Sequence, residues 1–315
     1  MANSFMIAFT AVIPFVLYLT FGFVSRRIGW AKESSLNEFN TLVFKAFFPF
    51  LMFQNMYQMD TDFSPNWTLV IFVLAAIALL ISVSMLVVPH FIPDDPSRGA
   101  IVQALYRGNY ALFALPLLDS IYGSEAASTG TMLLAFVVPF YNVAAVIILE
   151  YYQGRAASPK TLLLKILQNP LIIGIIIGAI VHFSGLKLPS VLESFVSTFA
   201  KMCTPLALFT LGGTLSFSSM KKNGRLLAIV LAIRMVIVPI IVYVIAGLFP
   251  LSAMERFMVM VVFGTPVAAA SYPMAKNMGS NGELAGELVA LSTVLSVFTL
   301  FVFIFVLNML GLMGL

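Results

Sequence analysis

The sequence predicts an all-α integral membrane protein with ten transmembrane helices, arranged as two inverted five-helix repeats. Three observations lead to this prediction: an apolar composition, charged loops that alternate, and an internal repeat. Hydrophobic residues make up 61% of the 315 residues and charged residues only 10%, and the mean hydropathy is +1.03. Since a soluble domain carries about 25% charged residues, too little polar surface remains to cover a water-soluble globule. Ten spans of about 20 residues leave no length for a soluble catalytic domain.

Apolar runs bounded by polar or Pro/Gly loops predict the ten helices. They cover residues 5–24, 36–54, 67–88, 98–121, 127–150, 162–183, 190–212, 225–248, 255–275 and 284–311. Arg26 and Arg27 follow the first run, which is long enough to span and has no basic segment before it. We therefore interpret it as a first helix rather than a cleaved signal.

Lysines and arginines outside the apolar runs gather in alternate loops. Eleven lie on one side: Arg26, Arg27, Lys32, Arg98, Arg155, Lys160, Lys165, Lys221, Lys222, Arg225 and Lys276. Only two, Lys187 and Arg256, lie on the other. The positive-inside rule then places both termini outside the cell, or in the periplasm, and the central loop in the cytoplasm. We expect a multi-pass protein of the plasma or inner membrane, and the net charge of +4 indicates cationic loops rather than nucleic-acid binding.

An internal repeat appears when the chain is aligned with itself at a shift of 156 residues. The aligned pairs are Pro14 with Pro170, Gly22 with Gly178, Gly29 with Gly185, Lys45 with Lys201, Pro49 with Pro205, Phe53 with Phe209 and Gly108 with Gly264. A unit of five helices is odd, so the second copy must be inverted. We expect a first repeat over 1–150, a short cytoplasmic linker over 151–160 and a second repeat over 161–315. Inverted repeats are typical of secondary transporters.

The fourth and ninth helices are predicted to break at equivalent positions near the middle of the membrane. The breaks fall at Gly108-Asn109 and at Gly264-Thr265-Pro266. Broken helices survive in a membrane where protein or a polar cavity satisfies their backbone groups. The alternative is that both are simply kinked packing helices.

The second half-helices are expected to begin around Tyr110 and Val267. Their free N–H groups and positive dipole ends attract an anion. The amide of Asn109 adds a donor for a carboxylate. Pro116 and Pro273, farther along, are expected to kink the two half-helices.

Charges inside the predicted helices also favour an anionic substrate. Four cations fall there, Lys45, Arg107, Lys201 and Arg234, whereas the acidic residues, Glu287 among them, sit near helix ends. Buried cations without matched carboxylates favour a mobile anion. For Lys45 and Lys201, snorkelling to the interface is an equal alternative, and Arg234 has the alternative of neutralising a helix C-terminus.

Polar side chains in two other helices have two interpretations. Tyr141 and Asn142 in the fifth helix, and a hydroxyl face in the tenth, are in a position to line the polar cavity. That face consists of Ser292, Thr293, Ser296 and Thr299. Small hydroxyl residues more often mediate helix packing, which we favour for the tenth helix. The role of Asn142 stays open.

Several motifs resemble those of the auxin efflux carrier family, from about Pro14 to Leu300. They are the stretch from Gly108 through Pro116 to Tyr122-Gly123, then Asn169-Pro170, Thr204-Pro205, Leu211-Gly212-Gly213, Gly264-Thr265-Pro266 and Ala275-Lys276. That family includes plant auxin exporters and bacterial carriers of malate or malonate.

The resemblance implies two inverted repeats whose fourth and ninth helices cross at their breaks. It implies a dimerising scaffold of helices one, two, six and seven, with the other helices moving as an elevator. Asn109, Pro116 and Pro266 match residues of the family's crossing. Lys45 resembles a lysine that some plant members pair with an aspartate of the third helix at a proton-linked site. Residues 67–88 here contain no acidic residue.

The expected function is transport of a small organic anion. The membrane potential favours export of an anion, by about 2.3 kcal/mol per charge per 100 mV, without a coupled ion. A sodium-coupled symporter of the bile acid symporter-like fold is the alternative, and a channel or sensor a more distant one. No motif of an enzyme is present. The single Cys203 and two separated histidines predict neither a metal site nor a cofactor.

Overall fold

The computed structural model describes residues 2–58, 66–153 and 159–314, and for residues 2–12 and a few helical positions, Pro116 among them, it describes the backbone alone. The first half contains α1 (Ala2–Arg27), α2 (Glu33–Leu42), the π-helix η1 (Val43–Phe47), α3 (Phe48–Tyr57), α4 (Trp67–Phe91), α5 (Asp95–Tyr106), α6 (Tyr110–Tyr122) and α7 (Ser124–Tyr152). The second half contains α8 (Pro159–Leu167), α9 (Pro170–Phe183), α10 (Ser190–Thr214), α11 (Phe217–Lys222), α12 (Gly224–Ala232), the π-helix η2 (Ile233–Ile237), α13 (Val238–Ala246), α14 (Ala253–Gly264), α15 (Ser271–Asn277) and α16 (Gly282–Met309).

Each apolar run of the sequence corresponds to one helical stretch or to a pair of helices. Five stretches in the described ranges are long and apolar enough to cross a membrane: Trp67–Phe91, Ser128–Tyr152, Ser190–Thr214, Gly224–Ala246 and Gly282–Met309. The run over 162–183 is divided into α8 and α9. The reason is local, because the side chain of Asn169 accepts the Leu171 N–H at 3.0 Å and Pro170 fills the first turn.

Two helical stretches contain a wide π turn immediately before a proline. The η1 segment ends two residues before Pro49, and η2 ends two residues before Pro239. A proline has no N–H to donate and its ring displaces the carbonyl four residues earlier, which favours a wider turn at that point. The turns place Lys45 in η1 and Arg234 in η2, one exposed and the other fully buried.

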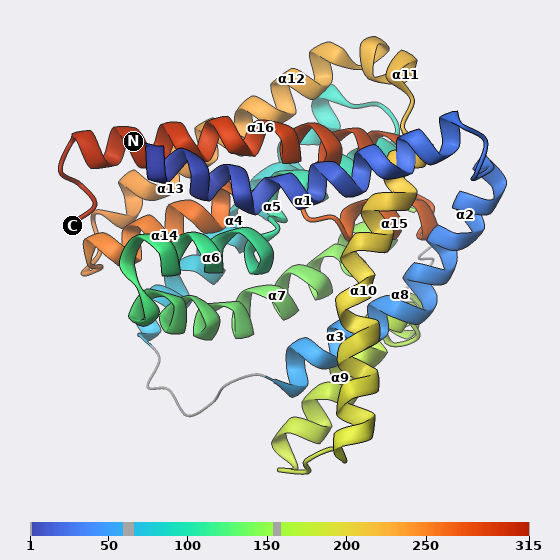
Figure 1. Ribbon diagram of the computed structural model, residues 1–315, viewed down its shortest axis with the longest axis horizontal. Helices are drawn as coiled ribbons and strands as arrows, with labels where there is room; N and C mark the ends of the chain where they lie inside the picture. Colours follow the sequence, from blue (N-terminus) through green and yellow to red (C-terminus); the bar gives the residue numbers. More distant parts are fainter. Residues whose placement is uncertain (1, 59–65, 154–158, 315) are drawn as a thin grey trace.

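Two close helix crossings hold α1 against α10 and α9 against α3. Gly22 of α1 lies against the carbonyl of Phe209 in α10, and Gly178 of α9 lies against the carbonyl of Phe53 in α3. A Cβ at either glycine would overlap that oxygen, so the small residue is what lets the backbones approach. Figure 1 shows α1 in blue crossing α10 in yellow. The four residues are two of the pairs that the 156-residue shift aligns.

The buried apolar side chains form two clusters. The larger cluster draws on α1, α4 to α7, α10 and α12 to α16, and the smaller one lies among η1, α3, α7, α9, α10 and α15. Both ends of the chain lie on the same side of the view in Figure 1, where α1 and α16 run alongside each other. The larger cluster encloses the two segments at which α5 gives way to α6 and α14 to α15.

Candidate functional site

The two helix breaks meet each other through their backbones. Gly108 and Val267 form an isolated antiparallel β-bridge. The Asn109 N–H donates to the carbonyl of Pro266 at 2.8 Å, and the Ala268 N–H donates to the carbonyl of Arg107 at 3.2 Å. Backbone groups that leave a helix inside a membrane need partners within the protein. Here each break supplies partners for the other, and the chain crosses itself at this point.

Local sequence explains where the helices stop. Pro266 cannot donate an N–H, and the residue before a proline is driven to extended backbone. Thr265 accordingly ends α14 with ψ 152°. At the other break, Arg107 ends α5 with ψ 102°, and Asn109 precedes α6 without using its side chain as a cap. The side-chain amide of Asn109 therefore makes no capping hydrogen bond to α6, the helix that follows it.

The second half-helices begin as expected in one break and not in the other. The α6 helix starts at Tyr110, but α15 starts at Ser271 rather than at Val267. The reason is that the Val267 N–H donates to the Ser292 hydroxyl at 3.0 Å, while its neighbour Ala268 pairs with the opposite break. The prediction of a half-helix beginning at Val267 was wrong, and Ser292 contacts the break in addition to packing.

Arg107 lies buried between the two breaks. Its Nη2 donates to the Oδ1 of Asn142 at 2.5 Å, and its Nη1 lies 2.6 Å from the sulfur of Met274. Asn142 in turn donates its Nδ2 to the carbonyl of Val138 at 2.8 Å. The ion pairs found in the described ranges do not include Arg107. The guanidinium group of Arg107 therefore contacts a neutral amide and a thioether.

Arg234 brings a second guanidinium to the same place from η2. The side chain is fully buried, and none of its three nitrogens has a hydrogen-bond partner among the residues that the structure describes. A Cβ added at Gly108 would lie 2.6 Å from Nη2 of Arg234, which fixes this guanidinium beside the first break. Burying a charge without a partner is costly. Two buried cations therefore flank one crossing.

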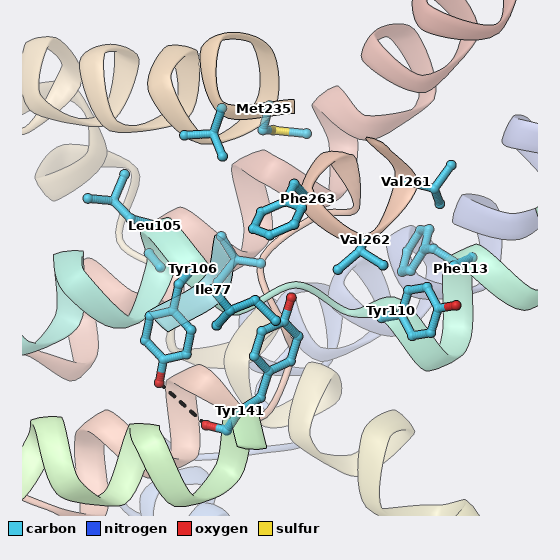
Figure 2. Close-up of a cluster of buried hydrophobic side chains, with 14 of the residues drawn as sticks. Ile77, Leu105, Tyr106, Tyr110, Phe113, Tyr141, Met235, Val261, Val262 and Phe263 are labelled. Carbon is cyan, nitrogen blue, oxygen red and sulfur yellow. Dashed lines mark hydrogen bonds between the residues drawn. The ribbon is translucent and has the colours of Figure 1, made fainter. Parts of the chain in front are cut away.

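Aromatic and apolar side chains surround the crossing, as Figure 2 shows. The Tyr110 hydroxyl donates to the carbonyl of Gly130 at 3.1 Å, and the Tyr106 hydroxyl donates to the carbonyl of Tyr141 at 3.4 Å. Tyr141 itself points from α7 towards the segment between α5 and α6. Phe263 lies on the other side of this segment from Tyr141 and is buried. The crossing is lined mainly by aromatic and apolar side chains, with a few polar groups among them.

The structure brings together most of the residues singled out in the sequence. Near the crossing lie Gly108, Asn109, Tyr110, Arg107, Asn142, Arg234, Gly264, Thr265, Pro266 and Pro273. Pro273 is buried within α15, and the Thr265 hydroxyl donates to the carbonyl of Val262 at 3.3 Å. Pro116 falls inside α6, but its side chain lies outside what the structure describes. Lys45 and Lys201 are exposed and do not join this group.

Sequence reasoning missed one contact of the site. Met274, which contacts Arg107, carries no signal in the sequence because a methionine in an apolar helix is ordinary. Tyr141 was noticed only as one polar residue of the fifth helix, because its position depends on how α7 packs. Its neighbour Asn142 accepts a hydrogen bond from Arg107. The spacing of residues along one helix does not predict this contact between two helices.

The equivalent glycines at the two breaks should respond differently to alanine. At Gly108 a Cβ would lie 2.5 Å from the hydroxyl oxygen of Thr265 and close to Arg234, whereas at Gly264 the nearest atom lies 3.7 Å away. We expect Gly108→Ala to lower the free energy of unfolding by about 1–3 kcal/mol through overpacking, and Gly264→Ala to change it little. Thermal unfolding of the purified variants measures the difference. Equal effects of both substitutions would contradict the close approach at Gly108.

Comparison with known proteins adds one finding to this geometry. A family model described as membrane transport protein matches residues 7–158 and again residues 155–304. The two matches cover most of the chain and fall on its two halves. A search of curated proteins finds no match.

Proposed function

Because the chain belongs to the membrane transport protein family of auxin efflux carriers, we propose that it moves a small organic anion across a membrane, with the helix crossing as the binding site. The observation that carries this proposal is the pair of buried guanidinium groups, Arg107 and Arg234. Neither has a carboxylate partner in the described part of the chain. Ionised groups inside a membrane protein are costly and usually mark the path of a substrate or ion.

The chemistry of the crossing favours a carboxylate as ligand. Guanidinium groups hold carboxylates through parallel N–H donors, more strongly than neutral donors do. Arg234 has all of its donors free. The N-terminal end of α6 adds a partial positive charge, and the unused amide of Asn109 adds a neutral donor. A malate-like, malonate-like or auxin-like acid fits these groups, whereas a cation is repelled by them.

The transport cycle that we propose is alternating access by an elevator-type movement. We propose ten spans in two inverted repeats, 1–150 and 161–315, joined by the linker 151–160. The matching contacts of Gly22 with Phe209 and of Gly178 with Phe53 support this symmetry, because equivalent residues make equivalent crossings. In this proposal helices one, two, six and seven form a scaffold within a homodimer, and the others carry the anion.

The location of the protein follows from the same proposal. A transporter family and several apolar helices make it a multi-pass membrane protein. We propose the plasma or inner membrane, with both termini outside, because the lysines and arginines outside the apolar runs gather in alternate loops. Membrane lipid and the anion are the proposed partners.

The test is a comparison of Asn109→Ala with Asn308→Ala in detergent and in liposomes. Malate, malonate and indole-3-acetate are each added to the purified protein, since a ligand of the folded state raises its unfolding temperature. We expect at least one acid to stabilise the protein, and Asn109→Ala to weaken that effect about tenfold or more. Asn308 is exposed near the end of α16, so its replacement should change nothing.

Counterflow of the stabilising acid in liposomes then tests transport. Uptake driven by the same unlabelled acid inside, and lost in Asn109→Ala, is the expected result. Stabilisation by neutral or cationic solutes, with none by any acid, would overturn the proposed substrate class. Equal activity of Asn109→Ala and Asn308→Ala would overturn the crossing as the binding site.

A further inference from the structure

A cavity of about 440 Å³ lies away from the crossing, where α10 ends and α16 begins. Its lining comes from four places: the end of α1 and start of α2, the end of α10, the helix α15, and the first turns of α16. The polar side chains that matter for the argument are Arg26, Thr214, Tyr272, Lys276, Glu283 and Glu287. None of the residues of the crossing belongs to this lining.

Glu287 is the unusual residue of the cavity. It is fully buried, although the sequence places it near a helix end where a carboxylate is ordinarily solvated. Its Oε2 accepts a hydrogen bond from Nδ2 of Asn223 at 2.9 Å, but its Oε1 has no partner in the described part of the chain. A buried carboxylate oxygen without a donor is costly, since the charge has lost its water. Glu287 belongs to the lining of the cavity, so a ligand held there would lie beside its carboxylate.

The two cationic side chains of the cavity, Arg26 and Lys276, already have partners within the protein. Arg26 pairs with Glu33 at 2.5 Å and also donates to the carbonyl of Gly213 at 3.0 Å. Lys276 donates to the Oδ1 of Asn37 and to the hydroxyl of Tyr272. With Arg26 and Glu33 cancelling each other, one cation, Lys276, faces two carboxylates. The lining therefore carries an excess of one negative charge.

The oxygen atoms around this excess charge suit a cation. Thr214 and Tyr272 contribute hydroxyls that bond each other at 2.7 Å, and Ser216 contributes a third. The cavity also lies at the C-terminal end of α10, which carries partial negative charge. Hydroxyl, carboxylate and carbonyl oxygens are the ligands of hard cations. A volume of about 440 Å³ also admits several water molecules, each of roughly 30 Å³, to complete a coordination shell.

We propose that this cavity binds a small monovalent cation, with the Oε1 of Glu287 as its anionic ligand, and that the cation is coupled to transport. The coupling rests on the proposed function, whereas the binding does not. The cavity wall joins α10 of the proposed scaffold to α15 and α16 of the proposed moving unit through Thr214 and Tyr272. Movement between these parts opens or closes the cavity, so its cation is bound in one state and released in the other. Sodium and potassium share the required chemistry.

The test measures the unfolding temperature of the detergent-purified protein with no organic acid present. The first arm replaces N-methylglucamine chloride by sodium chloride at constant pH and ionic strength. The second arm replaces N-methylglucamine chloride by potassium chloride under the same conditions. We expect one arm to raise the unfolding temperature of the wild type by about 3 °C or more. The rise should vanish in Glu287→Gln, persist in part in Glu287→Asp and remain whole in Glu125→Gln, whose side chain is exposed at the start of α7.

The arms identify the cation and also allow the proposal to fail. A sodium effect lost in Glu287→Gln assigns sodium, and a potassium effect lost in that variant assigns potassium. No rise in either arm for the wild type would overturn the proposal even if Glu287→Gln cannot be purified. A rise that Glu287→Gln retains would also overturn it. A cation effect without stabilisation by any organic acid would leave this site standing and reject the proposed anion substrate.

Discussion

Replacement of Gly212 by valine is expected to leave no folded protein in the membrane. Gly212 of α10 lies directly against the carbonyl of Leu19 in α1, and a Cβ at this position would overlap that oxygen. A backbone atom cannot move aside as a flexible side chain does, so the two helices must separate along their contact. One extra methylene in a packed core costs about 1–3 kcal/mol, and valine adds three carbons against backbone. Total stability is only about 5–15 kcal/mol.

Gly224→Val is the matched control, because no atom would lie within 4 Å of a Cβ at Gly224, in the first turn of α12. Size-exclusion profiles of detergent extracts and thermal unfolding report the outcome. The control should give a single peak and an unfolding temperature close to that of the wild type. A folded Gly212→Val protein with the same profile would mean that α1 and α10 do not cross as closely as described.

Such glycines show what the sequence predicts well. Apolar runs of a fixed length and the repeated glycines were sufficient to locate the helices, because a membrane imposes both the length of a span and the need for small residues at crossings. The break at Gly108 was predicted because Gly108-Asn109 and Gly264-Thr265-Pro266 interrupt apolar runs at equivalent positions of the repeat. The packing of Gly22 on Phe209 then needed the structure, because a repeat in sequence does not specify partners.

The charged residues were harder to interpret from the sequence. Lys45 and Lys201 share a repeated pattern with Pro49 and Pro205, yet both are exposed. A pattern along one helix gives a residue's position on the chain but not the face of the bundle to which it points. Snorkelling, or contact with lipid headgroups, agrees with their exposure. Arg234 lies on a π turn, whose extra residue rotates the following face in a way that a regular period does not predict.

The burial of Glu287 could not be predicted from its place near a helix end. Its side chain is fully buried, and its carboxylate accepts a hydrogen bond from Asn223, just before α12. Burial of this kind depends on how distant segments pack. The same reason explains why α15 begins at Ser271, since the hydroxyl of Ser292 from another helix holds the Val267 N–H.

Arg107→Met is expected to abolish binding of the organic anion while leaving the protein folded. Methionine is flexible, apolar and similar in length, and replacing a buried charge by an apolar side chain is often neutral or stabilising. The Oδ1 of Asn142 loses its donor, which costs about 1–3 kcal/mol and offsets part of that gain. The ligand loses a charge-assisted contact worth about 2–5 kcal/mol, so its affinity should fall about 100-fold or more.

Two further variants separate the site from the net charge of the protein. Arg107→Lys keeps the cation but loses the planar pair of donors, and it should bind the anion with intermediate affinity. Arg225→Met removes an exposed cation of α12 and should bind as the wild type does. Calorimetric titration of each purified variant with the stabilising acid gives the affinities. Wild-type binding by Arg107→Met, or an equal loss in Arg225→Met, would show that the crossing does not hold the anion, because only a local contact distinguishes these two cations.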